Sequence, residues 1–171
     1  MMNTENNKHL QYLSDLSDYK VASDDPDVRG WDVKDVDGRV IGKVNSFLVN
    51  KNKGKVRYLE VEVDQSIIED GHKVYTESSN GKVHEILNGE GENHLIVPIG
   101  LASIDRDDQY VKVDDVNHET FAATKRIRSG QEIEPHYELE VLRSYRGRER
   151  FPENTVINDQ FYENEEFNHR L

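Results

Sequence analysis

The sequence predicts a mainly β protein built around a small antiparallel barrel. Short segments of alternating apolar and polar residues recur between Gly30 and Val116, as expected for strands with one buried face. Turn signals such as Asp37-Gly38 separate these segments, and glycines within them mark places where a small sheet bends. Of the 171 residues, 35% are apolar and 33% are charged, which favours one compact domain with solvated extensions.

Residues 1–26 are expected to form an N-terminal strap or short helix that lies on the folded body. Leu10, Leu13 and Leu16 recur at three-residue spacing, with Tyr12 and Tyr19 beside them. A helix of this length is too short to be stable alone. The segment "SDDPD" that follows is typical of a turn before a folded domain.

The barrel itself is predicted over residues 27–116, with a polar insert at 64–93. Asp37-Gly38 is interpreted as a two-residue hairpin turn in which both residues take positive φ. Gly42 is expected at a bulge or bend of the return strand. Pro98 and Gly100 end an apolar strand, and the insert is predicted to contain a second hairpin around Asn80-Gly81.

In the strand "KVRYLEVEV" Leu59, Val61 and Val63 are assigned to the core, and Glu60 and Glu62 are assigned to a solvated face. Val56 and Tyr58 lie on the opposite parity to Leu59, so the strand either bends there or is covered on both faces. The same reasoning on the other strands gives a predicted core, which consists of Val33, Val40, Val44, Leu48, Leu59, Val61, Val63, Ile96, Ile99 and Val111.

Residues 117–171 are predicted to be a C-terminal extension with an amphipathic helix at about 134–146 and an acidic tail. Pro135 suits the first turn of a helix, and the basic run "RGRER" suits its end. Tyr137, Val141 and Tyr145 recur at four-residue spacing with Leu142 beside them, so this face needs a surface to cover. That surface is either the protein's own barrel or a second subunit. The tail "NDQFYENEEFNHRL" is expected to dock weakly or to be disordered.

The sequence resembles a known family. The segments "DPDVRG", the "DG" turn, "RYLEVEV", "VPIG" (Val97 to Gly100) and "YVKVDDV" occur in the order and spacing of the PRC-barrel domain. The sequence is similar to the cytoplasmic domain of the H subunit of photosynthetic reaction centres, over about residues 24–147, as a soluble stand-alone member without the membrane helix. The resemblance implies a PRC-type barrel and a non-enzymatic role.

The sequence signals for a catalytic site or a metal site are weak. There is no cysteine, and an EF-hand register through Gly38 would place Val33 and Val44 at ligand positions. The histidines lack zinc spacing, although His72, His84 and His94 would converge if the insert folded over the barrel. Glu60, Glu62 and Asp64 are interpreted as a solvated row, and no nucleophile or phosphate-binding motif is present. We therefore expect no catalytic residues, no cofactor and no metal.

The formal net charge of −12 disfavours nucleic acid and anionic membrane surfaces as partners. The most apolar stretch, Leu95 to Ile104, is half the length of a membrane helix, so we expect no membrane insertion and a cytoplasmic location. The predicted function is a protein-interaction or assembly module. The predicted partner is unknown, and a homodimer is expected through a surface formed by Tyr137, Val141, Leu142 and Tyr145. The alternatives are a metal- or small-ligand-binding stress protein that uses the insert and a ribosome- or RNA-associated barrel, which the charge disfavours.

Overall fold

A computed structural model describes residues 10–13, 27–50, 53–69, 88 and 91–168. Within these ranges the elements are β1 (Gln11–Tyr12), β2 (Asp32–Lys34), β3 (Val40–Asn50), β4 (Lys55–Val63), β5 (His94–Pro98), η3 (Ile99–Leu101), β6 (Ala102–Asp105), β7 (Tyr110–Val113), α2 (His118–Ala122), α3 (Pro135–Arg146), η4 (Phe161–Glu163) and η5 (Glu165–Phe167). The predicted hairpin at Asn80-Gly81 lies outside the described residues.

The strands form one curled sheet in the order β5-β4-β3-β2-β7-β6, and β1 pairs with β3. All pairs are antiparallel except β2 and β7, which are parallel. The prediction of a closed antiparallel barrel is therefore wrong in two respects, because one pair is parallel and no ladder joins the end strands β5 and β6 in the described part of the sheet. These two strands are consecutive in the chain, and η3 connects the two ends of the sheet.

The first hairpin turn differs from its prediction. Gly38 takes the left-handed conformation with φ of 85°, but Asp37 does not. The Gly38 N–H donates to the carbonyl of Asp35, and the Asp35 N–H donates to the carbonyl of Arg39. This pattern is a three-residue loop with glycine at the left-handed position rather than a two-residue turn.

Nine of the ten predicted core residues are buried, and Val40 is the exception. Val40 is 36% exposed, whereas its neighbour Ile41 is fully buried. The pairing of β2 with β3 jumps from Val33 opposite Gly42 to Lys34 opposite Val40. Ile41 is therefore the extra residue of a bulge, and the bulge reverses the alternation that the sequence indicates. The predicted bend at Gly42 has the same origin.

Gly42 also permits a close approach between β3 and β4. A Cβ on Gly42 would lie 2.2 Å from the backbone oxygen of Glu62. The absence of a side chain therefore lets the two strands pair where the sheet bends.

The described part of the N-terminal strap is a short strand. Gln11 and Tyr12 pair with Val49 and Leu48 of β3. The Tyr12 hydroxyl donates to the carbonyl of Gln131, just before α3. The strap therefore connects the sheet to the C-terminal extension.

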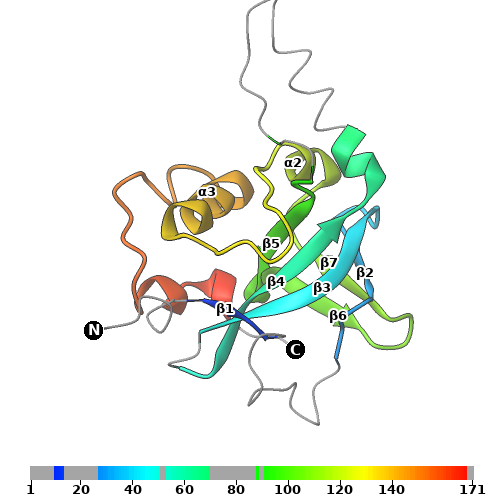
Figure 1. Ribbon diagram of the computed structural model, residues 1–171, viewed down its shortest axis with the longest axis horizontal. Helices are drawn as coiled ribbons and strands as arrows, with labels where there is room; N and C mark the ends of the chain where they lie inside the picture. Colours follow the sequence, from blue (N-terminus) through cyan, green and yellow to red (C-terminus); the bar gives the residue numbers. More distant parts are fainter. Residues whose placement is uncertain (1–9, 14–26, 51–52, 70–87, 89–90, 169–171) are drawn as a thin grey trace, which may run out of the picture.

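The C-terminal extension packs on one side of the sheet (Figure 1). Helix α3 begins with Pro135 at its first turn and is followed by Gly147, with φ of 97°. Within α3, only Pro135, His136 and Glu140 are exposed. A helix buried on so many sides is covered by more than one layer, and here the layers are the sheet and the residues that follow the helix.

Candidate functional site

The predicted interaction surface on α3 is buried within the chain. Tyr137, Val141, Leu142 and Tyr145 are all nearly or fully buried. The Tyr145 hydroxyl donates to the carbonyl of Ile96 on β5 over 2.9 Å, and the Tyr137 hydroxyl donates to the carbonyl of Lys125 over 2.8 Å. These four side chains belong to the intramolecular core, so the assignment of this surface to a partner is corrected. The physical argument for a homodimer through α3 is lost with it.

A buried carboxylate lies at the centre of the C-terminal packing. Glu138 on α3 is fully buried. Its Oε1 accepts a hydrogen bond from the Tyr58 hydroxyl of β4 over 2.9 Å and another from the Tyr162 hydroxyl of η4. One carboxylate oxygen therefore connects the sheet, the helix and the segment that follows the helix.

Burial raises the pKa of Glu138 to about 7, although the two tyrosine hydrogen bonds act in the opposite direction. Burial also raises the pKa of Tyr58 and Tyr162, and the charge of Glu138 adds to both shifts. Both tyrosines therefore remain protonated donors near neutrality. The guanidinium carbon of Arg57 lies 4.7 Å from the Tyr162 ring centroid, which places a cation over the face of that ring.

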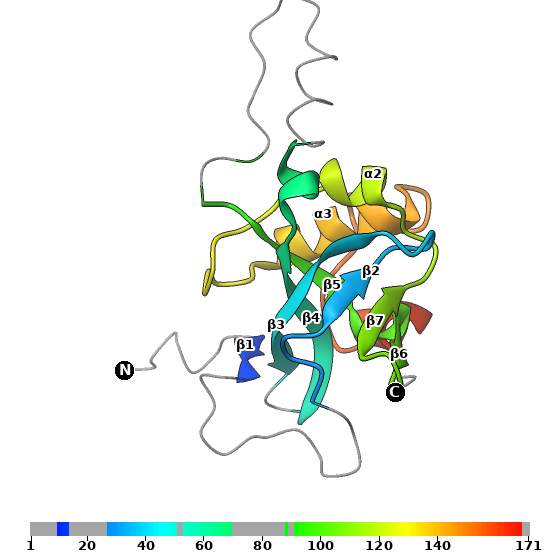
Figure 2. The same ribbon diagram turned by 90° about the vertical axis from the view of Figure 1, so that its right-hand side faces the viewer.

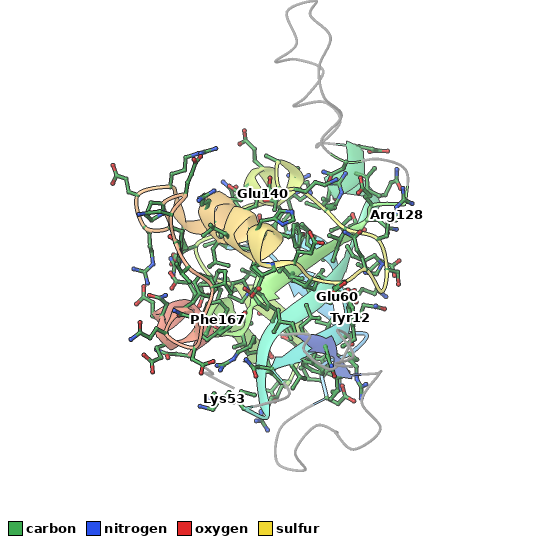
Figure 3. The ribbon with its side chains drawn as sticks, turned by 60° about the vertical axis from the view of Figure 1, so that its left-hand side comes forward. Tyr12, Lys53, Glu60, Arg128, Glu140 and Phe167 are labelled. Atoms are coloured by element: carbon green, nitrogen blue, oxygen red, sulfur yellow. The ribbon has the colours of Figure 1, made fainter. Side chains whose placement is uncertain are left out.

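The C-terminal tail, which we define as residues 152–168, docks closely on the sheet. Phe161, Tyr162 and Phe167 are buried, and Phe167 meets Tyr58 edge-on with centroids 5.3 Å apart. Figure 3 shows Phe167 where the tail meets the sheet. The tail is thus part of the core, so the expected weak docking or disorder is wrong for these residues.

Ion pairs also connect the tail to α3 and to the residues that follow α3. Glu166 is buried and accepts two hydrogen bonds from Arg150, over 2.5 and 2.8 Å. Arg146 lies 3.1 Å from Glu166 and 3.4 Å from Asp115, in the loop after β7. Burial alone would raise the pKa of Glu166, but its bonds to Arg150 and the nearby charge of Arg146 lower it.

Gly100, predicted as a turn residue, has a different role. A Cβ on Gly100 would lie 2.5 Å from the backbone oxygens of Glu165 and Glu166. Gly100 therefore forms the seat for η5, and Pro98 precedes the 3-10 turn that presents it.

We predict that Gly100→Ala displaces the tail. Backbone oxygens cannot rotate away as a side chain can. The added methyl group would therefore clash with η5 and force it away from residue 100. Hydrogen exchange of the peptide covering 152–168 should become at least tenfold faster. Glu163→Ala, on the exposed side of the tail, is the matched control and should leave the exchange unchanged. Equal exchange in the Gly100→Ala and parent proteins would contradict this account of the seat.

Asp35 organises the first hairpin. Its Oδ1 accepts from the N–H groups of Asp37 and Arg39, and its Oδ2 accepts from the N–H of His118 at the start of α2, over 2.7 Å. Asp35 is buried. Asp37 and Gly38 thus form a structural turn whose geometry Asp35 sets, and Asp35 connects that turn to α2.

Asp64, Ser66 and His118 lie together but do not form a catalytic triad. The Ser66 hydroxyl donates to Asp64 Oδ2 over 2.7 Å, so it accepts from His118 Nε2 at 2.9 Å. In a triad the histidine would instead accept the serine proton and contact the carboxylate. Asp64 also accepts from the Ser66 N–H, which is the arrangement of a helix cap at residues 65–69.

Glu60 is buried, which corrects its assignment to a solvated row, while Glu62 and Asp64 are exposed. Glu60 Oε1 accepts from Asn45 Nδ2 over 2.6 Å, and Oε2 lies 3.5 Å from Nδ1 of the buried His94. Glu60 is buried because β4 is covered on both sides, with the C-terminal extension over the face that carries Tyr58 and Glu60.

Among the described residues, no group of three or more histidine, cysteine, aspartate or glutamate side chains is arranged to hold a metal ion. His72 and His84 of the insert lie outside these residues. No helix in the described ranges has the length and apolar character needed to cross a bilayer.

In the part of the chain that the structure describes, the helices and the tail leave one face of the sheet open. We define this open face as the outward residues of β2, β7 and β6, which are Asp32, Lys34, Tyr110, Lys112, Ser103 and Asp105. All six are half-buried, while the intervening Val33, Val111 and Val113 are buried. Figure 2 shows these strands in front, with α3 behind the sheet.

The strand register arranges the open face in two rows. Asp32, Tyr110 and Asp105 lie opposite one another, and Lys34, Lys112 and Ser103 form the second row. Lys34 Nζ lies 4.0 Å from the Tyr110 ring centroid. The open face therefore presents an accessible tyrosine between carboxylates and a pair of adjacent lysines.

Sequence reasoning missed Glu138, although a signal was present. Glu138, Val141, Leu142 and Tyr145 have the spacing i, i+3, i+4 and i+7, so a carboxylate lies within the apolar stripe. A charged residue at such a position is buried only with partners. Its partners, Tyr58 and Tyr162, are 80 and 24 residues away, and no local pattern identifies them.

The comparison with known protein families agrees with this architecture. The sequence matches the PRC-barrel domain over residues 20–118, which includes every strand from β2 to β7 and more than half of the chain. No curated protein sequence matches. The chain belongs to the PRC-barrel domain family.

Proposed function

We propose that this PRC-barrel protein is a non-enzymatic protein-interaction or assembly module that contacts its partner through the open face. The supporting observation is the division of the sheet into a covered and an open side. The outer side of β4 and β5 is covered by α3 and the tail, whereas Tyr110 and the two lysines of the open face remain half-exposed.

The buried ionisable groups support a structural use of the interior. Glu138 accepts from two tyrosines, Asp35 accepts from three backbone N–H groups, and Glu166 accepts from Arg150. Each of these groups connects two or more segments. A catalytic carboxylate would instead need to contact a substrate. The polar and charged groups that another molecule can contact therefore lie on the surface.

The chemistry of the open face suits a protein contact. Tyrosine provides a large rigid surface with one polar end, and such residues are enriched at interfaces. Lys34 and Lys112 are paired in the register of β2 and β7, so the open face carries two cations in one row, to which an acidic side chain of a partner would be attracted. In a chain with a net charge of −12, this local pair distinguishes the open face from its surroundings.

Site-specific photocrosslinking in the native cell tests the proposal. A benzophenone side chain at position 110 should give one discrete adduct, whereas the same group at the exposed position 140 of α3 should not. The double variant Lys34→Glu, Lys112→Glu should abolish the adduct at position 110. Equal adducts from both positions, an adduct unaffected by the charge reversal, or no adduct at position 110 would each contradict the proposal. An adduct of twice the chain mass would identify the partner as a second copy.

A further inference from the structure

Glu138 joins three segments through one oxygen atom. Its Oε1 accepts from Tyr58 of β4 and from Tyr162 of η4, while its Oε2 is buried and has no hydrogen-bond partner among the described residues. A charged carboxylate normally needs partners for both oxygens when it is buried. The ionised form of Glu138 therefore lacks a partner for one of its two oxygens, and the neutral form costs less free energy to bury.

The groups around Glu138 do not compensate for its charge. From β4 come Tyr58 and Arg57, and the Arg57 guanidinium stacks over Tyr162. From η4 comes Tyr162, and Glu166 of η5 pairs with Arg150 rather than with Glu138. Glu166 is bound by Arg150 and Arg146, and no cation among the described residues pairs directly with Glu138.

The C-terminal tail is the segment able to respond to this charge. Beyond Tyr162 it is held by aromatic contacts, by the Glu166–Arg150 pair and by its seat on Gly100. Its regular structure consists of two 3-10 turns of three residues each, η4 and η5. It makes no strand pairing with the sheet in the described structure. Segments with few backbone hydrogen bonds to the rest of the fold open locally without global unfolding.

We propose that Glu138 is a proton-operated latch for the C-terminal tail. The neutral carboxyl keeps the tail docked through Tyr162, and ionisation weakens docking. Release of the tail uncovers Tyr58 and the seat at Gly100, and thereby exposes a second surface on the side of the sheet opposite the open face.

The direction of the pH dependence follows from proton linkage. When the tail is docked, burial raises the pKa of Glu138 from 4.5 to about 7, and when the tail is released, water restores the ordinary value. The docked state therefore binds more protons between these values, and docking weakens as the pH rises toward 7. Between pH 5.5 and pH 8 the docking equilibrium should fall about 30-fold, with little further change above pH 8.

Amide hydrogen exchange followed by NMR tests the latch on the full chain. The N–H groups of Phe161, Glu163, Phe167 and Asn168 donate within the tail and report its opening. Expressed as protection factors, which remove the intrinsic pH dependence of exchange, they should fall about 30-fold from pH 5.5 to pH 8. Glu138→Gln should abolish this fall, because the amide keeps an acceptor for the tyrosines but does not ionise. Glu140→Gln, on the exposed side of the same helix (Figure 3), should retain it.

A fall of less than threefold in the parent protein would overturn the latch, as would an undiminished fall in Glu138→Gln. The second result would assign the pH dependence to groups other than Glu138. If Glu138→Gln does not fold, the carboxyl carbon resonance of Glu138 in the parent protein decides. A titration midpoint near 7 supports the latch, and a midpoint near 4.5 overturns it. The photocrosslinking result at position 110 is independent of every one of these outcomes.

Discussion

Deletion of residues 131–171 should abolish cooperative folding of the barrel. The deletion removes α3 and the tail, whose buried aromatic and aliphatic side chains include Tyr137, Leu142, Tyr145, Phe161 and Phe167. Burial of each such side chain contributes about 1.5–3 kcal/mol. Their sum is comparable with the whole stability of a small domain, which is about 5–15 kcal/mol.

The deletion also exposes the outer face of β4 and β5. The Tyr58 hydroxyl would lose its acceptor on Glu138, and the carbonyl of Ile96 would lose its donor on Tyr145. Thermal melting by circular dichroism, combined with light scattering, measures the outcome. A folded monomer with an unchanged melting temperature would contradict the account. A folded dimer would instead restore the hypothesis that a second copy covers this face.

Leu59→Ala should destabilise the protein by about 2–5 kcal/mol. Leu59 is buried on β4, opposite Phe47 of β3 and Val97 of β5, so its truncation leaves a cavity that paired strands cannot close. Val40→Ala is the control, because Val40 is 36% exposed and should change the free energy of unfolding by less than about 0.5 kcal/mol. Urea denaturation of both variants provides the comparison. Equal losses at the two positions would show that the bulge at Ile41 is misplaced.

The sequence predicts the strand content and most of the core because alternation is a local property. Leu59, Val61 and Val63 share one parity, and the predicted face is the buried one. The same rule fails at Val40, since a bulge adds one residue and reverses the faces. It fails at Glu60 for a different reason. Alternation assumes one solvated face, but the C-terminal extension covers the face that Glu60 shares with Tyr58.

Helix α3 illustrates a second limit of structure prediction from the sequence. The spacing of Tyr137, Val141 and Tyr145 indicates an apolar stripe that must be covered, and it does not indicate by what. In the structure, the sheet and the tail provide the cover. The tail's sequence, rich in charge with three aromatics, gives no periodic signal, since it docks through 3-10 turns and isolated side chains. Its seat depends on Gly100, 65 residues before Glu165, which a sequence pattern cannot connect to it.

The candidate functional residues were predictable to different degrees. Asp37 and Gly38 carry a turn signal, and only the turn type was misassigned, because Asp35 accepts N–H groups within the loop. The open face required the strand order. Tyr110 and Lys34 become neighbours through the parallel pairing of β2 with β7, which joins segments about 75 residues apart and leaves no trace in local spacing.

In the described structure, the C-terminal extension covers one side of the sheet within a single chain and leaves the opposite side open. Hydroxyl-radical footprinting of the tyrosines over a dilution series tests this claim most directly. The account predicts that Tyr110 reacts rapidly and that Tyr58, Tyr137, Tyr145 and Tyr162 are protected at every concentration. Rapid modification of Tyr137 and Tyr145, or protection of these two residues only at high protein concentration, would contradict it.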